Sequence, residues 1–216
     1  MTSAAQWREI FNSKRRSWLT FSGVVLLLST FVLNFYVSSY ADSAATSTVG
    51  DLFLDNIPIF KIDFLFFWAV LIFWLVMLGY HILRPKQLAF IMWSISAFVV
   101  VRCFFISLTH LGPPESAIEI PDSLSWFNFT ADMFFSGHVG APFLVALLLD
   151  NKVLKRIIYL YSVCMVVIVL MAHGHYSIDI FASFFISHSI SILMKKTEHK
   201  FYDSGNQDDQ LAKEAI

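Results

Sequence analysis

Six apolar runs, separated by short polar segments, dominate the hydrophobic pattern of this chain. They cover residues 18–40, 59–83, 88–109, 133–149, 157–172 and 175–194. A helix needs about 20 mostly apolar residues to cross the ~30 Å hydrocarbon core of a bilayer, and these runs approach or exceed that length. The first run is longer than the apolar core of a cleaved signal peptide, which has about 7–15 residues. The pattern therefore predicts an all-α, multi-pass membrane protein with a bundle of six transmembrane helices.

Polar segments flank this bundle at both ends of the chain. The predicted parts are an N-terminal segment, a six-span membrane domain and a polar tail, at residues 1–17, 18–194 and 195–216. In the first of these, Trp7, Ile10 and Phe11 fall at helical spacing ahead of three basic residues. This spacing predicts a short interfacial helix with a basic edge, and a frayed terminus is the alternative. We expect the polar tail to be weakly ordered.

The composition supports a membrane protein. Hydrophobic residues make up 57% of the chain and charged residues only 14%, whereas soluble domains carry about 25% charged residues. Cys103 and Cys164 both lie inside apolar runs, so we expect them to pack as small apolar residues rather than to form disulfides. No cluster of His, Cys or Asp has the spacing of metal ligands. We therefore expect no metal, no other cofactor and no nucleic-acid partner.

Basic residues gather in the segments that six spans would place on one side of the membrane. They are Arg8, Lys14, Arg15, Arg16, Arg84, Lys86, Lys152, Lys155, Arg156, Lys195, Lys196, Lys200 and Lys213. Only Lys61 and Arg102 lie elsewhere. Because cytoplasmic loops carry an excess of lysine and arginine, both termini are predicted to be cytoplasmic.

The candidate chemistry lies at the opposite, non-cytoplasmic level. His138 is near the outer start of the fourth span and His175 near the outer start of the sixth, 37 residues later. These residues suffice for one membrane crossing and one return crossing of about 17 residues each, or roughly 26 Å of helix. Both histidines are therefore predicted to lie at the same depth. Arg102 lies near the outer end of the third span. A pocket for one phosphate requires the two histidines to lie within about 8–10 Å of each other.

Each of these residues has a functional and a structural interpretation. Asp179 follows His175 by one helical turn, so it can orient the imidazole, or it can simply favour the positive end of the helix dipole. Placing the charged Arg102 side chain against lipid would cost from about 2.5 to more than 10 kcal/mol of free energy. This cost favours an inward-facing side chain that binds phosphate over one that extends to the outer headgroups. Ser136 and Gly137 precede His138, and a glycine with free amides at a helix start suits an anion.

Three segments carry a resemblance to sphingomyelin synthases. They are Arg102-Cys103 with Thr109, Leu111 and Pro114 (R-C-x5-T-x-L-x-x-P), Asp132 to His138 (D-x3-S-G-H), and His175 to Asp179 (H-Y-S-x-D). The resemblance covers residues 102 to 180. Those enzymes belong to the type 2 phosphatidic acid phosphatase superfamily, whose fold is a bundle of six membrane helices. The resemblance implies an enzyme of phospholipid and sphingolipid metabolism with its active site on the periplasmic, luminal or extracellular side.

The resemblance also implies a mechanism. His175, oriented by Asp179, would attack phosphorus and form a phosphohistidine, and His138 would protonate the departing lipid alkoxide. Arg102, with the amides near Ser136 and Gly137, would stabilise charge on the phosphoryl oxygens. A lipid alcohol as acceptor gives a phosphotransferase, and water gives a lipid phosphatase. Asp132 and Trp126 are candidate contacts for a choline or ethanolamine head group.

The sequence also departs from relatives in that superfamily. Residues 130 and 131 are Thr and Ala, where the synthases tend to have Cys and Gly. Ordinary lipid phosphatases carry a K-x6-R-P segment and an arginine six residues before the second histidine; here the equivalent positions hold Ile95, Cys103 and Val169. A site with fewer cations suits a singly charged phosphodiester better than a phosphomonoester, which favours head-group transfer. A transporter, and a scaffold that has lost the chemistry, are the non-enzymatic alternatives.

Overall fold

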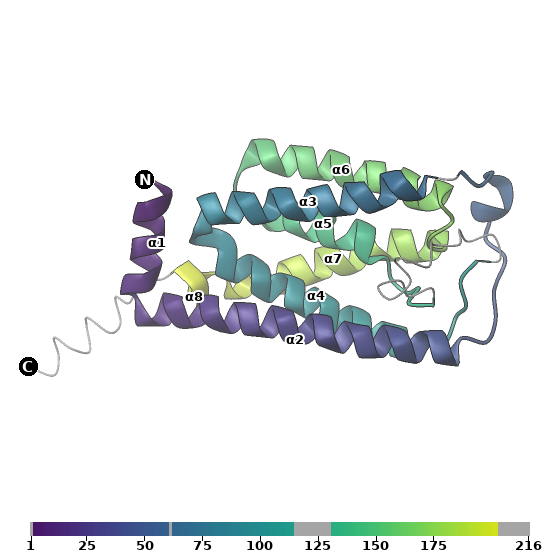
Figure 1. The fold of residues 1–216 in the computed structure, drawn as a ribbon, viewed down its shortest axis with the longest axis horizontal. Coiled ribbons are helices and arrows are strands. Elements are labelled where there is room, and N and C mark those ends of the chain that lie inside the picture. The colour runs from purple at the N-terminus through teal and green to yellow at the C-terminus, as the bar shows by residue number, and fades with distance from the viewer. Residues whose placement is uncertain (1, 61, 115–130, 203–216) are drawn as a thin grey trace, which may run out of the picture.

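In a computed structural model, which describes residues 2–60, 62–114 and 131–202, the chain is all-helical. These ranges contain no β-strand, although an isolated bridge joins Ser47 and Leu111. Five helices are long and apolar enough to cross a membrane. They are α2 (Lys14–Ala44), α3 (Asp63–Leu83), α4 (Leu88–Leu108), α6 (Lys152–Met171) and α7 (Ser177–Thr197). Figure 1 shows them running side by side along the long axis of the molecule.

The fourth predicted span is shorter in the structure than in the sequence pattern. Helix α5 covers only Gly137–Leu148, because Ser136 before it and Leu149 after it both have extended backbone conformations. At 1.5 Å per residue this helix is about 18 Å long, less than the ~30 Å hydrocarbon core. Most of its residues are buried, since α5 packs against α4, α6 and α7. The described residues thus form five long apolar helices and one short one at the centre of the bundle.

Two further boundaries differ from the sequence prediction. Helix α6 begins at Lys152 rather than at residue 157, because the Asn151 side chain accepts hydrogen bonds from the next amides, of Val153 and Leu154. The tail predicted from residue 195 begins in helix. Helix α7 continues to Thr197, and α8 (His199–Tyr202) then packs its aromatic rings against α4.

The N-terminal segment forms a helix of its own, as its apolar spacing predicts. Helix α1 (Ser3–Asn12) lies at the end of the bundle, where the Trp7 indole donates a hydrogen bond of 2.9 Å to the Ile82 carbonyl at the end of α3. A short 3₁₀ helix, η2 (Pro85–Gln87), connects α3 to α4 beside it. A second one, η1 (Leu54–Asn56), lies in the segment between α2 and α3, at the other end of the molecule.

Helices α4, α5 and α7 meet closely at Gly140. A Cβ atom there would lie 2.9 Å from two carbons of the Phe98 ring and 3.0 Å from the Ser187 hydroxyl. That hydroxyl donates a hydrogen bond of 2.9 Å to the Gly140 carbonyl. The absence of a side chain at this position lets α5 approach both neighbours, and this approach positions the start of α5.

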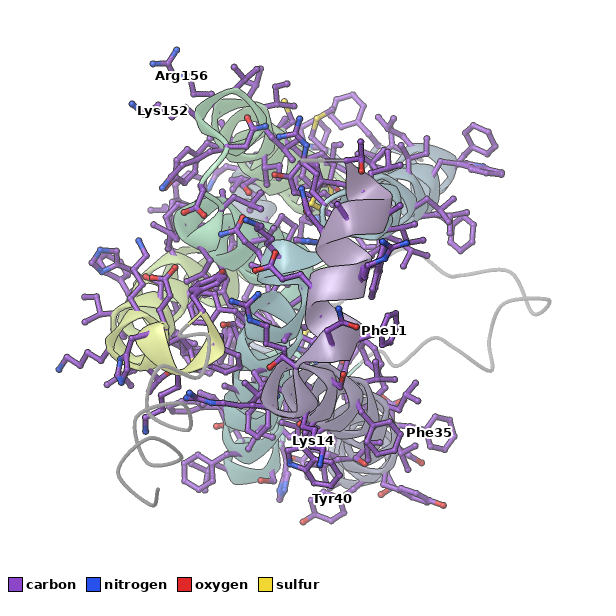
Figure 2. The ribbon with its side chains drawn as sticks, turned by 90° about the vertical axis from the view of Figure 1, so that its left-hand side faces the viewer. Phe11, Lys14, Phe35, Tyr40, Lys152 and Arg156 are labelled. Atoms are coloured by element: carbon purple, nitrogen blue, oxygen red, sulfur yellow. The ribbon has the colours of Figure 1, made fainter. Side chains whose placement is uncertain are left out.

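Basic residues gather at one end of the bundle. Figure 1 shows α1 and α8 at this end, and Figure 2, which faces it, labels Lys14, Lys152 and Arg156. The starts of α5 and α7 lie at the opposite end, with the segment that follows α2. The structure therefore separates these basic residues from the candidate histidines along the long axis of the bundle, whereas Arg102 reaches the start of α5.

Candidate active site

The two histidine motifs meet at the starts of α5 and α7. The ring centroids of His138 and His175 are 5.8 Å apart, within the separation that a shared phosphate pocket requires. The Ser136 amide donates a hydrogen bond of 3.1 Å to the Asp179 carbonyl, which joins the two helix starts directly. The Phe66 ring from α3 lies 4.6 Å from the His138 ring, centroid to centroid, and forms a wall of the site.

Asp179 faces His175 and also supports the start of its own helix. Its Oδ2 lies 3.6 Å from the His175 Nδ1, which is slightly beyond hydrogen-bond distance. The same oxygen accepts a hydrogen bond of 3.2 Å from the Tyr176 amide. Both interpretations of Asp179 therefore describe real contacts. Catalytic hydrogen bonds are often long in a structure without substrate, and the contact through Nδ1 leaves Nε2 of His175 for a reacting group.

The site contains buried polar atoms without partners. Among the residues that the structure describes, no hydrogen bond is made by the Ser136 Oγ, the His138 Nδ1, the His175 Nδ1 or the Asp179 Oδ1. Buried polar groups in folded proteins almost always have a partner, so several unpaired ones together indicate a place for a polar ligand or water. The first amides of any α-helix lack an intrahelical acceptor, and in α5 the Ser136 side chain does not supply one either. These donors suit an anion.

Arg102 lies beside this site, but its guanidinium already binds protein groups. It donates to the Phe135 carbonyl at 2.9 Å, to Asn34 at 3.1 Å, and to the carbonyl and carboxylate of Asp132 at 2.6 and 3.0 Å. Four of its five N–H donors are therefore used. A Cβ on Gly137 would lie 3.4 Å from its Nε, so the guanidinium reaches the start of α5. Its charge is compensated by the carboxylate of Asp132.

The ion pair between Arg102 and Asp132 bears on the roles predicted for both residues. The sequence predicts phosphate binding for Arg102 and a head-group contact for Asp132, and both roles stay predictions. In the structure the two side chains bind each other, and the Ser38 hydroxyl also donates to the Asp132 carboxylate at 3.2 Å. The remaining head-group candidate, Trp126, lies outside the described residues. Val169, where lipid phosphatases carry an arginine, is fully buried in an apolar cluster and brings no charge to the site.

Two polar side chains of α2 hold this network, and the sequence did not predict which group they contact. Asn34 and Ser38 are one turn apart on α2, and Asn34 donates to Ser38 at 3.4 Å while accepting from Arg102. Two polar side chains at (i, i+4) inside an apolar run are a signal that a polar group on a neighbouring helix faces them. The sequence contains that signal, but it does not say which group they face.

The segment after α2 folds over the start of α7 and binds it. The Ser177 amide donates a hydrogen bond of 2.7 Å to the Asp51 carboxylate. The Tyr176 hydroxyl donates to the Gly112 carbonyl at 3.0 Å and accepts from the Val49 amide at 3.3 Å. Burial acts to raise the pKa of Asp51, but hydrogen bonds from backbone amides, that of Ser177 foremost, outweigh it and lower this pKa below its ordinary value.

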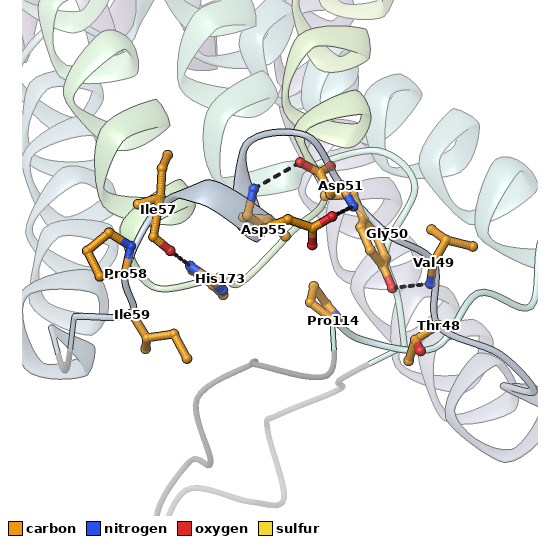
Figure 3. A pocket seen from close by; sticks show the side chains of 12 residues that line it. Thr48, Val49, Gly50, Asp51, Asp55, Ile57, Pro58, Ile59, Pro114 and His173 are labelled. Atoms are coloured by element: carbon orange, nitrogen blue, oxygen red, sulfur yellow. Dashed lines mark hydrogen bonds between the residues drawn. The ribbon is translucent and has the colours of Figure 1, made fainter.

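A cavity of about 590 Å³ lies beneath this segment (Figure 3). Its lining includes Asp51, Pro114, His173 and Tyr176, but neither His138 nor His175. His173 is almost fully buried, and its Nε2 lies 3.0 Å from the Ile57 carbonyl. The backbone of His173 has a positive φ of 48° where α6 ends, a conformation that favours glycine. This histidine therefore holds the segment after α2 against the turn that leads to His175.

Neither a metal cluster among the described residues nor a matching family model identifies this site. In the part of the chain that the structure describes, no group of three or more His, Cys, Asp or Glu side chains is placed to hold a metal ion. Comparison of the sequence with protein-family models and with curated proteins finds no match. The geometry of the site and the sequence motifs are therefore the observations that bear on the function of the chain.

Proposed function

We propose that the chain is an integral membrane lipid phosphotransferase, similar to sphingomyelin synthases, that moves a phospho-head-group from a phospholipid to a lipid alcohol. The observation that carries the proposal is the pair of imidazoles 5.8 Å apart. They lie among unpaired buried polar atoms and at the open N-terminus of α5. One phosphoryl group between the two rings can contact a nucleophile on one side and a proton donor on the other.

In the first step, Nε2 of His175 attacks phosphorus. The bond from phosphorus to the lipid oxygen breaks, and its electron pair leaves with that oxygen. The protonated imidazole of His138 gives the oxygen a proton, so the products are a phosphohistidine and a neutral lipid alcohol. Asp179 compensates the positive charge that develops on His175, which makes it a positioning residue.

In the second step, the hydroxyl of an acceptor lipid attacks the phosphohistidine. His138, now neutral, takes the hydroxyl proton as the new bond from oxygen to phosphorus forms and the bond from nitrogen to phosphorus breaks. This returns both histidines to their starting protonation states. Charge on the phosphoryl oxygens is stabilised by the first amides of α5 and by Ser136, with Arg102 held next to them.

The charges near the site support transfer over hydrolysis of a phosphomonoester. Arg102 is paired with Asp132, and Val169 brings no charge, so the described residues place little uncompensated positive charge beside the two histidines. A phosphodiester carries one negative charge, whereas a phosphomonoester carries nearly two and is better stabilised by additional cations. Phosphatase activity with water as acceptor is the second candidate, and it would use the same histidines.

The distribution of basic residues supports a non-cytoplasmic active site. If α5 and its flanking residues complete a sixth crossing, both termini and the basic end of the bundle lie in the cytoplasm. The histidines then lie at the opposite, outer headgroup level, where a phospholipid can present its phosphate from the bilayer.

The direct test is a product analysis with the purified protein. It is incubated with phosphatidylcholine, phosphatidylethanolamine or phosphatidic acid, each with and without ceramide. We expect a new phospho-head-group lipid that forms only when the acceptor is present. Release of free phosphate or free head-group phosphate without acceptor would favour the phosphatase.

Two histidine variants make this test specific. His175→Ala removes the nucleophile and is expected to abolish turnover, whereas His188→Ala, on the exposed side of α7, is the matched control and leaves it intact. Full turnover by the His175 variant would exclude the proposed mechanism and favour a transporter or scaffold. Radiolabelled head group should remain on the wild-type protein as an acid-labile adduct when the acceptor is withheld.

A further inference from the structure

A second cavity lies at the basic end of the bundle, opposite the end that holds His138 and His175. Its volume is about 150 Å³, and its walls come from α1, the start of α2, η2, the start of α4 and α8. None of the proposed catalytic residues lines it. The position places the cavity at the level where the long helices leave the apolar region, because the basic residues of the chain gather at this end.

Buried polar atoms without partners line this cavity. Arg16 uses two of its nitrogens in protein contacts, to the Glu9 carboxylate at 2.6 Å and to the Tyr202 carbonyl at 3.1 Å. Its Nε is buried and donates to no acceptor in the described part of the chain, and the side-chain oxygen of Gln6 is likewise buried and unpaired. An unpaired guanidinium N–H requires an acceptor, and the Gln6 amide can present either its oxygen or its nitrogen.

The charge near the cavity is positive. Arg16 is balanced by Glu9, but Lys86 also lines the cavity and forms no ion pair with any described residue. The acceptor that satisfies Arg16 next to Lys86 is therefore best an anion, and a phosphate oxygen matches both donors. A free carboxylate from the protein itself does not fill this place among the described residues.

Much of the remaining lining is apolar. Ile10, Leu19, Ala89 and Phe201 form walls of the same cavity. A small inorganic anion would gain nothing from these side chains, whereas an amphiphile would bury its glycerol and upper acyl carbons against them. Cationic and apolar groups in one cavity at the membrane surface are the combination that an anionic phospholipid recognises.

We propose that this cavity binds the head group of an anionic phospholipid from the leaflet at the basic end. The lipid phosphate accepts from the Arg16 Nε and lies near the Lys86 ammonium, and its glycerol region packs between Leu19 and Ala89. Because the ligand touches α1, α2, α4 and α8 together, its binding holds the terminal helices against the bundle. This site is separate from the proposed active site and does not depend on it.

The test is lipid binding by the full-length protein in detergent, with bound phosphatidylglycerol and phosphatidylcholine counted by native mass spectrometry. Lys86→Gln removes the free cation and is expected to weaken phosphatidylglycerol binding about fivefold. Ala89→Leu fills the cavity and is expected to have at least the same effect. Lys152→Gln is the matched control, because Lys152 is an exposed lysine at the same end that does not line the cavity (Figure 2).

The outcomes are distinct. Lipid bound at the histidine site contributes equally to all variants, so only the difference between Lys86→Gln and Lys152→Gln reports this cavity. An equal loss of phosphatidylglycerol binding in both variants would show that only the general surface charge matters, and would overturn the proposed site. The lipid assignment would be overturned if inorganic phosphate or glycerol 3-phosphate saturated the cavity at the same concentration as phosphatidylglycerol. The acyl chains would then contribute nothing to the affinity.

Discussion

Replacing Asp132 with asparagine tests how the bundle tolerates Arg102. Asp132 provides the carboxylate that pairs with Arg102 at 3.0 Å, and the two side chains are only 17% and 7% exposed. The substitution leaves a buried guanidinium without a counter-ion. Removing one partner of a buried ion pair costs about 3–5 kcal/mol. Arg102 keeps its bonds to Asn34 and to two carbonyls, and Asp132 is partly exposed, so we expect a smaller cost of ~2–3 kcal/mol.

The assay is thermal unfolding of the purified protein, followed by tryptophan fluorescence. For a chain of this size, a loss of ~1 kcal/mol lowers Tm by about 2–4 °C, so Asp132→Asn should lower it by about 4–12 °C. Asp150→Asn is the control, because Asp150 is exposed and its carboxylate forms no ion pair with any described residue. The double variant Arg102→Met with Asp132→Leu should recover much of the lost stability, because it buries no charge at all.

The result that would refute this reasoning is equally clear. An unchanged Tm in Asp132→Asn, together with a raised KM for a choline phospholipid, would show that Asp132 serves the head group and not Arg102. A double variant less stable than either single variant would show that the two side chains do more for the bundle than neutralise each other.

Three other substitutions test contacts near the site. Gly140→Ala should lower stability by about 1–3 kcal/mol, because its Cβ would lie 2.9 Å from the Phe98 ring, whereas Gly79→Ala, with open space around it, should be neutral or stabilising. Tyr176→Phe leaves two backbone groups unpaired and should cost about 1–3 kcal/mol, with faster hydrogen exchange in both loops that its hydroxyl joins. The lowered pKa of Asp51 means that its stabilisation is complete above its ordinary pKa of 3.8 and is lost as pH falls below it. The advantage of the wild type over Asp51→Asn in Tm should therefore shrink in acid.

The long helices were predictable because the signal for them is local. A helix crossing a bilayer satisfies its backbone hydrogen bonds within one segment, so its length and apolar composition can be read without knowledge of its neighbours. His138 and His175 were predicted to lie at one depth from the number of residues between them. The structure brings their rings together, although the helix that begins beside His138 is shorter than a hydrocarbon core. Basic residues at one end of the chain's spans are likewise a local signal, and the structure gathers them at one end of the bundle.

The contacts inside the site were not predictable, because each depends on a group distant in the chain. Helix α5 is shorter than its apolar run because the backbone is extended at Ser136 and at Leu149, and the apolar pattern marks neither change. The pairing of Arg102 with Asp132 depends on the extended backbone before α5, which no periodicity encodes. Asp51 binds the start of α7 across 126 positions of the sequence. Sequence alone thus indicated which segments are helices and that the two histidine motifs would meet, whereas the tertiary structure decided which polar groups satisfy one another and which remain for a ligand.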